Sequence, residues 1–133
     1  MNSIIMGALL STSCNLVFNP SVSTTGSYCV SSSADFREIR YNEKIAICNR
    51  NVSAKTKDQV YKNYNVNLSD RILYTIDHKV PLFLGGSNDI NNLWPQLKET
   101  SSAKLENLVY ILLSKKKITA QEATDLVMSV KGK

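Results

Sequence analysis

The chain contains a single histidine, His78, which directly follows Asp77. An imidazole has an ordinary pKa of about 6.5, so it can take up a proton near neutral pH and suits the role of a general base. A carboxylate is a hard oxygen ligand of the kind that divalent cations such as Mg²⁺ prefer. The pair could therefore support hydrolysis in which a base activates water and a cation neutralises developing charge.

The residues around this pair predict how it is held. Residues 72–76 are apolar and β-prone, which predicts a strand, and residues 80–84 predict a second one. Pro81 would put the second strand at a sheet edge, because proline has no N–H to donate. The glycines in residues 85–88 permit a tight loop. We therefore expect a short hairpin at the pair.

Helices are predicted on both sides of this hairpin. Apolar residues recur at helical spacing in residues 101–113, and Thr119-Ala120-Gln121-Glu122 predicts a capping box before a last helix over 120–130. Thr56-Lys57-Asp58-Gln59 predicts another box, with Thr56 as N-cap of a helix near 57–64 that Asn65 could end. Residues 36–48 fit either a strand or a turn of helix. The Ser-, Thr-, Asn- and Gly-rich residues 15–35 predict a linker or loosely ordered arm.

The order of strand, Asp-His pair, second strand, glycine-rich loop, asparagine-rich turn and helix is that of a ββα finger. In this the chain resembles the HNH branch of the His-Me finger nucleases, through the run YTIDHKVPLFLGGSNDINNLWPQ over residues 74–96. Weaker similarity extends from about residue 28 to about 130. The resemblance implies an α+β, mainly helical small domain over 21–133, with a ββα-metal finger at about 72–114.

The resemblance also assigns roles to single residues. His78 would be the general base, and Asp77 would bind a divalent metal, with Mg²⁺ favoured and Mn²⁺ or Zn²⁺ as alternatives. Asn92 would brace the loop and fix the orientation of the base, since an amide can donate and accept at once. Asn88 could cap the glycine turn in a similar way, or be an ordinary turn asparagine.

One position departs from the family pattern. A third His or Asn is expected nine residues after Asn92, where this chain has Ser101, while the Lys expected three residues later is present as Lys104. Gln96 or Glu106 could complete the metal site instead, or water could. We therefore predict Asp77, Gln96 and Ser101 as the metal-binding set.

Three basic residues are predicted to contact nucleic acid, namely Arg50, Lys79 and Lys104. The planar guanidinium of Arg50 could bind the scissile phosphate, or form only a surface ion pair. Lys104 could contact phosphate or be a solvated surface lysine. The formal net charge of +5 favours polyanionic partners, and DNA is preferred over RNA. A monomer or weak oligomer is expected.

The N-terminus and the cysteines favour export. Residues 1–20 resemble a secretory signal or lipoprotein segment with a linker, and Cys14 is a candidate for lipidation. Their apolar run is too short for a stable membrane span. If Cys14 lies at or before the cleavage point, Cys29 and Cys48 remain as a pair, which predicts a disulfide in an exported protein. Two unconnected buried thiols are the alternative.

Together these observations predict a small exported endonuclease that hydrolyses phosphodiester bonds, most simply in DNA and with low sequence specificity. Because the third metal ligand is missing at Ser101, a nucleic-acid-binding module with weak or no catalysis is the main alternative. A third is an exported structural or envelope protein lipidated at Cys14.

Overall fold

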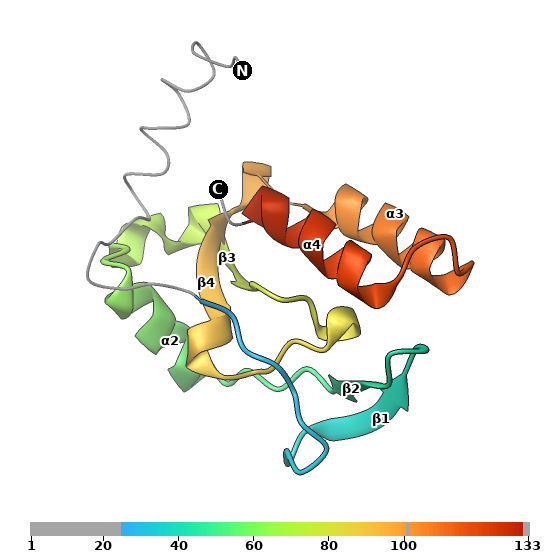
Figure 1. The fold of residues 1–133 in the computed structure, drawn as a ribbon. Helices are drawn as coiled ribbons and strands as arrows, with labels where there is room; N and C mark the ends of the chain where they lie inside the picture. Colours follow the sequence, from blue (N-terminus) through green and yellow to red (C-terminus); the bar gives the residue numbers. More distant parts are fainter. Residues whose placement is uncertain (1–24, 101, 132–133) are drawn as a thin grey trace.

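Helices and two small antiparallel sheets combine in an α+β fold, as the sequence predicts (Figure 1). The computed structural model describes residues 25–100 and 102–131. Within them, short 3₁₀ segments link the strands and helices. The main elements are β1 Phe36–Arg40, β2 Ile45–Cys48, α2 Ala54–Asn63, β3 Tyr74–His78, β4 Leu93–Leu97, α3 Ala103–Ser114 and α4 Ala120–Lys131.

The strand that pairs with β3 is not the predicted one. β3 pairs antiparallel with β4, so that Asp77 is the partner of Trp94 and His78 the partner of Leu93. The prediction of a strand over 80–84 is wrong, since this stretch contains a 3₁₀ turn, Leu82–Leu84. A long loop, rather than a tight hairpin turn, therefore joins the two strands and follows His78 directly.

Two glycines explain why this stretch folds as a loop. Gly85 has a φ of +92°, a left-handed conformation that side chains with a Cβ rarely adopt. Gly86 approaches the chain so closely that a Cβ there would lie 1.8 Å from the carbonyl oxygen of Val80. A continuous strand needs neither a left-handed residue nor so close a backbone contact. Both glycines therefore favour a loop in this segment.

Helix α2 begins earlier than the sequence predicts. The prediction of Thr56 as N-cap is wrong, because Ser53 caps the helix and its Oγ accepts a hydrogen bond from Thr56 N at 3.1 Å. Ser53 and Thr56 both have a hydroxyl suited to capping, and the sequence alone does not choose between them. Gln59, which the sequence predicts to complete a capping box with Thr56, donates to Asn63 Oδ1 instead. The expected end is confirmed, since Asn65 follows the helix with a φ of +58°.

Helices α3 and α4 confirm the predictions over 101–113 and 120–130, although residue 101 is outside the described residues. The predicted capping box is present. Thr119 N donates to Glu122 Oε1 at 2.9 Å, and Glu122 N donates to Thr119 Oγ1 at 3.1 Å. Figure 1 shows the two helices side by side, joined by the short lysine-containing connection.

The buried apolar side chains form two clusters that meet near His78. One joins the loop after β3 to α3 and α4, through Val80, Leu84, Val109, Leu113, Ala120, Ala123 and Val127. The other joins α2 to the β3–β4 sheet, through Val60, Tyr64, Val66, Tyr74 and Leu93. Since β3 contributes to one cluster and the residues after it to the other, the Asp-His pair is anchored from both sides.

The described part of the predicted linker, residues 25–35, is packed against the rest of the fold. Tyr28 forms a β-bridge with Gly86, and Cys29 N donates to Gly85 O at 2.8 Å. The predicted disulfide between Cys29 and Cys48 is confirmed, with both residues buried. A loosely ordered arm is therefore the wrong prediction for residues 25–35, and the ambiguous residues 36–48 form the β1–β2 hairpin.

The predicted signal or lipoprotein segment over 1–20, including Cys14, lies outside the described residues, as do residues 21–24. Among the helices that the structure describes, none combines the length and apolar character needed to cross a bilayer. Disulfides are typical of exported proteins, because the cytosol keeps thiols reduced. The Cys29–Cys48 bond is thus compatible with the predicted export.

Candidate active site

His78 is the last residue of β3 and is only 4% exposed. Its Nε2 lies 3.0 Å from Oδ1 of Asn88, which belongs to the loop between β3 and β4. An amide oxygen can only accept, so this contact requires a proton on Nε2. In the neutral ring Nδ1 is then the unprotonated nitrogen, which is the state a general base needs.

Burial is the main influence on the charge of this ring. It lowers the pKa of His78 below the ordinary 6.5, because the buried surroundings disfavour the imidazolium. The hydrogen bond with Asn88 and the charge of Asp77 raise the pKa, but less. The positive charges of Arg50 and Lys131 lower it further. Burial therefore favours the neutral form of the ring.

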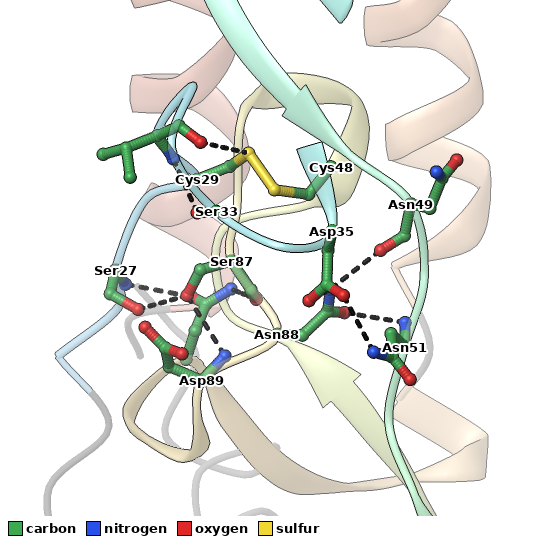
Figure 2. Close-up of a disulfide and its surroundings, with 12 residues drawn as sticks. Ser27, Cys29, Ser33, Asp35, Cys48, Asn49, Asn51, Ser87, Asn88 and Asp89 are labelled. Atoms are coloured by element: carbon green, nitrogen blue, oxygen red, sulfur yellow. Dashed lines mark hydrogen bonds between the residues drawn. A yellow bond between two sulfur atoms is a disulfide. The ribbon is translucent and has the colours of Figure 1, made fainter. Parts of the chain in front are cut away.

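Chemistry fixes the way in which the Asn88 amide is turned. Its Nδ2 donates to Asp35 Oδ2 at 3.0 Å and to Asn49 O at 2.7 Å, two groups that only accept. Its Oδ1 accepts from Asn51 N at 3.1 Å, a group that only donates. Figure 2 shows these residues gathered around Asn88. Rotating the amide by half a turn would oppose like groups at Asp35, Asn49 and Asn51, so Oδ1 must face His78.

Asn92 is fully buried, and its side chain spans the loop. Its Oδ1 accepts from Val80 N at 3.0 Å, and its Nδ2 donates to Val80 O at 3.1 Å and to Ser87 O at 2.8 Å. Oδ1 also accepts from Ser27 N at 3.3 Å, in the packed N-terminal arm. Asn92 thus connects the two ends of the loop, and Asn88 is the loop residue whose side chain contacts the His78 ring.

Asp77 contacts a buried lysine from the end of α4. Lys131 Nζ lies 2.8 Å from Asp77 Oδ2 and 2.8 Å from Glu106 Oε2, and its side chain is 1% exposed. It also donates to the carbonyl oxygen of His78 at 2.8 Å. Its three N–H groups therefore have three oxygen acceptors. Asp77 Oδ2 in addition accepts from Trp94 Nε1 at 3.2 Å.

As arranged here, the predicted metal ligands do not fit a divalent cation. The Lys131 ammonium already contacts Asp77, and a second cation at the same oxygen would be repelled. Gln96 is buried and its Nε2 donates to Thr100 O at 2.9 Å, while Ser101 lies outside the described residues. Residues 25–100 and 102–131 contain no group of three or more His, Cys, Asp or Glu side chains that could hold a metal. The predicted Mg²⁺ stays a prediction.

The three predicted nucleic-acid contacts differ in their surroundings. Arg50 is exposed, and its charge is close enough to lower the pKa of His78. Lys104 is exposed on α3. Lys79 is half-buried, donates to Lys131 O at 3.0 Å and lies 5.4 Å from the centre of the Trp94 ring. Of these three, Arg50 is therefore the exposed side chain whose charge acts on His78.

A hollow of about 520 Å³ lies elsewhere, between the β1–β2 turn and the connection of α3 to α4. None of the predicted site residues lines it. Its walls carry both charges and apolar atoms, from Tyr41, Asn42, Glu43, Leu113, Ser114, Lys116, Lys117, Ile118, Thr119 and Glu122. The hollow is therefore separate from His78 and Asp77.

Sequence reasoning missed three residues of the site. Asn88 lies within the recognised motif, but nothing in the spacing shows that it bonds the base. Asp35 and Lys131 each lie 53 residues from their partners, Asn88 and His78 respectively, and no local pattern connects them. The last helix is predicted from the capping box at its start, which gives no reason to expect a buried lysine at its end.

No protein-family model, no curated protein and no solved structure matches this chain.

Proposed function

We propose that this chain is an endonuclease that hydrolyses phosphodiester bonds, with His78 as the general base. The unit formed by β3, the loop, β4 and α3 is then the ββα finger that the sequence predicts. DNA is the proposed substrate, read through its backbone more than its bases. Export to an oxidising compartment is part of the proposal, and the Cys29–Cys48 disulfide is compatible with it.

The observation that carries the proposal is the state of His78. A buried, neutral imidazole whose Nε2 is held by Asn88 has one nitrogen left, Nδ1, to accept a proton. Asn88, the partner of Nε2, is itself held by three further hydrogen bonds. This degree of fixation is typical of groups that must present one atom in one direction.

The reaction can be written for the residues that are present. Nδ1 of His78 takes a proton from a water molecule as the water oxygen attacks phosphorus. The bond from phosphorus to the leaving oxygen breaks, and solvent supplies the proton for that oxygen. Arg50, exposed beside the base, would bind the phosphate oxygens through its planar fork. No step is assigned to a metal.

The test is cleavage of supercoiled plasmid by wild type and His78→Ala, purified identically, in Mg²⁺, in Mn²⁺ and in EDTA. Loss of a general base should reduce the rate by roughly 10²–10⁴-fold. Arg50→Ala should weaken cleavage with an intact fold, and thermal unfolding confirms that each variant is folded. Undiminished cleavage by His78→Ala would falsify the proposal. The three metal conditions separately test the predicted metal requirement.

A second candidate is a binding module that does not cut, and the contact between Lys131 and Asp77 favours it. If the charge of Asp77 is already neutralised, catalysis that depends on a metal there would be weak. Fluorescence anisotropy with labelled DNA and RNA would then show salt-dependent binding, with no nicking in any metal condition. Binding without cleavage would select this candidate, and cleavage that depends on His78 would exclude it.

A further inference from the structure

Asp35 lies outside the proposed finger but contacts the residue that holds the base. It precedes β1 in the chain and is 53 residues from Asn88, whose Nδ2 donates to its Oδ2 at 3.0 Å. Of the groups that orient the Asn88 amide, Asp35 is the side chain and the charged one, whereas Asn49 and Asn51 contribute backbone atoms. Hydrogen bonds to an ionised acceptor are stronger than neutral ones.

The second carboxylate oxygen of Asp35 holds the other side of the same arrangement. Oδ1 accepts from Asn51 Nδ2 at 2.8 Å, and the backbone oxygen of Asp35 accepts from Asn49 N at 2.8 Å. Asp35 therefore bonds to Asn88 and also to the segment that supplies the remaining partners of Asn88. Without its carboxylate, both the amide and the segment beside it lose an anchor.

A disulfide lies close to Asp35 in the fold. Cys48 immediately precedes Asn49 and is the register partner of Phe36, the residue after Asp35. The Cys29–Cys48 disulfide ties this place to the N-terminal arm (Figure 2). Asp35 thus lies beside a cross-linked part of the fold, and it is only half-buried although the histidine is buried.

From these contacts we infer that Asp35 is a positioning residue for His78, acting through Asn88. The carboxylate keeps the amide turned so that its oxygen faces Nε2 of the ring, and this leaves Nδ1 free. The inference concerns the orientation of the ring in the folded protein. Its consequence for catalysis rests on the proposed function, in which Nδ1 is the base.

Because His78 is the single histidine of the chain, NMR of its ring reports on this chain of contacts without assignment problems. Long-range ¹H–¹⁵N spectra identify which nitrogen carries the proton, and exchange with water reports how firmly Nε2–H is held. We expect the wild type to have its proton on Nε2 and to exchange it slowly. In Asp35→Leu, exchange of this proton should be faster by at least about tenfold, because a charge-assisted bond is lost.

The matched control is Asp89→Leu, which removes an exposed carboxylate next to Asn88 in sequence and should leave the ring signals unchanged. Backbone amides in α3 separate a local effect from general destabilisation. If Asp35→Leu does not fold, Asp35→Asn, which keeps an oxygen acceptor without the charge, should still accelerate the exchange. The inference is overturned by a wild-type proton on Nδ1, by unchanged exchange in the folded Asp35 variant, or by acceleration no greater than that of the α3 amides.

The kinetics of plasmid cleavage give a second test, which concerns catalysis. Asp35→Leu should lower kcat with little change in KM, since Asp35 lies behind Asn88 and not beside the substrate. Should His78→Ala still cut DNA, the proposed function fails while the NMR result on Asp35 stands. An altered ring with unaltered kcat would equally reject the role of Nδ1 as base but keep the positioning contact.

Discussion

At the scale of single residues, the properties of His78 come from its neighbours more than from its own type. An exposed histidine is partly charged near neutral pH, and either ring nitrogen can carry its single proton when neutral. Here burial keeps the ring neutral, and the oxygen of Asn88 selects the protonated nitrogen. Both choices favour the form that accepts a proton at Nδ1.

This state predicts a specific dependence on pH. The pKa of His78 lies below 6.5 in the folded protein and near 6.5 in the unfolded chain. At a pH between the folded and the unfolded pKa, the unfolded state therefore binds more protons than the folded state. The free energy of unfolding should therefore rise with pH through this window. The contribution of the neutral ring to stability should be fully lost below the folded pKa. NMR titration of the ring in EDTA should give a midpoint below 6.5.

Comparison with His78→Gln isolates this contribution. Other groups titrate equally in both proteins, so the wild type should lose more stability than the variant when the pH falls from about 7 to about 5. Urea unfolding at the two pH values measures the difference. A ring midpoint at or above 6.5 would contradict the prediction.

Gly86 allows a second prediction at this scale. A Cβ at this position would lie 1.8 Å from Val80 O and 2.7 Å from Val80 C, both backbone atoms that cannot move aside. Gly86→Ala should therefore destabilise the fold by about 2 kcal/mol or more, as overpacking does. Urea unfolding measures this, and Ser31→Ala, on an exposed turn, serves as the control. Wild-type stability in Gly86→Ala would show that the loop can rearrange.

At the scale of elements, helices were easier to predict than the sheet. The helical spacing of α3 and the capping box of α4 are local signals, and both helices are present in the structure. The pairing of β3 with β4 depends on a loop whose conformation is set by Asn92, and this is a contact between distant parts of the loop. A run such as 80–84 is apolar because it is buried, and burial alone does not distinguish a strand from a turn.

The start of α2 gives a testable case of two competing local signals. Ser53 Oγ accepts from Thr56 N, so Ser53→Ala should cost about 1 kcal/mol of stability. Thr56→Ala removes the hydroxyl that accepts from Ser53 Oγ but leaves the cap, and it should cost less. Chemical denaturation of both variants decides between them. A larger loss in Thr56→Ala would mean that the sequence prediction of the cap is right after all.

At the scale of the whole molecule, Lys131 connects three elements. Its ammonium joins Asp77 on β3, Glu106 on α3 and the end of α4 where it resides. Lys79 Nζ in turn donates to the backbone oxygen of Lys131. The two apolar clusters are thus joined by a polar contact at the point where the Asp-His pair lies. The contacts of the candidate site therefore also help to stabilise the fold.

Removal of the Lys131 ammonium should lower the free energy of unfolding. Lys131→Met leaves Asp77 and Glu106 without a shared cation, and breaking a buried ion pair in this way typically costs about 3 kcal/mol or more. Urea unfolding should show this loss. The double variant Lys131→Met with Glu106→Gln removes one of the two carboxylates and should recover part of the stability. An unchanged unfolding curve for Lys131→Met would contradict the role of Lys131 in holding the three elements together.

The position of Lys131 also has a consequence for biosynthesis. Ribosomes make chains from the N-terminus, and domains fold as their parts become available. His78 is made 53 residues before the lysine that bonds its carbonyl oxygen, and Glu106 is also made before that lysine. Before Lys131 is made, the nascent chain contains Asp77, His78 and, from residue 106 on, Glu106, but not the cation that lies between the two carboxylates. The Asp-His pair therefore reaches its final surroundings only when translation has passed residue 131.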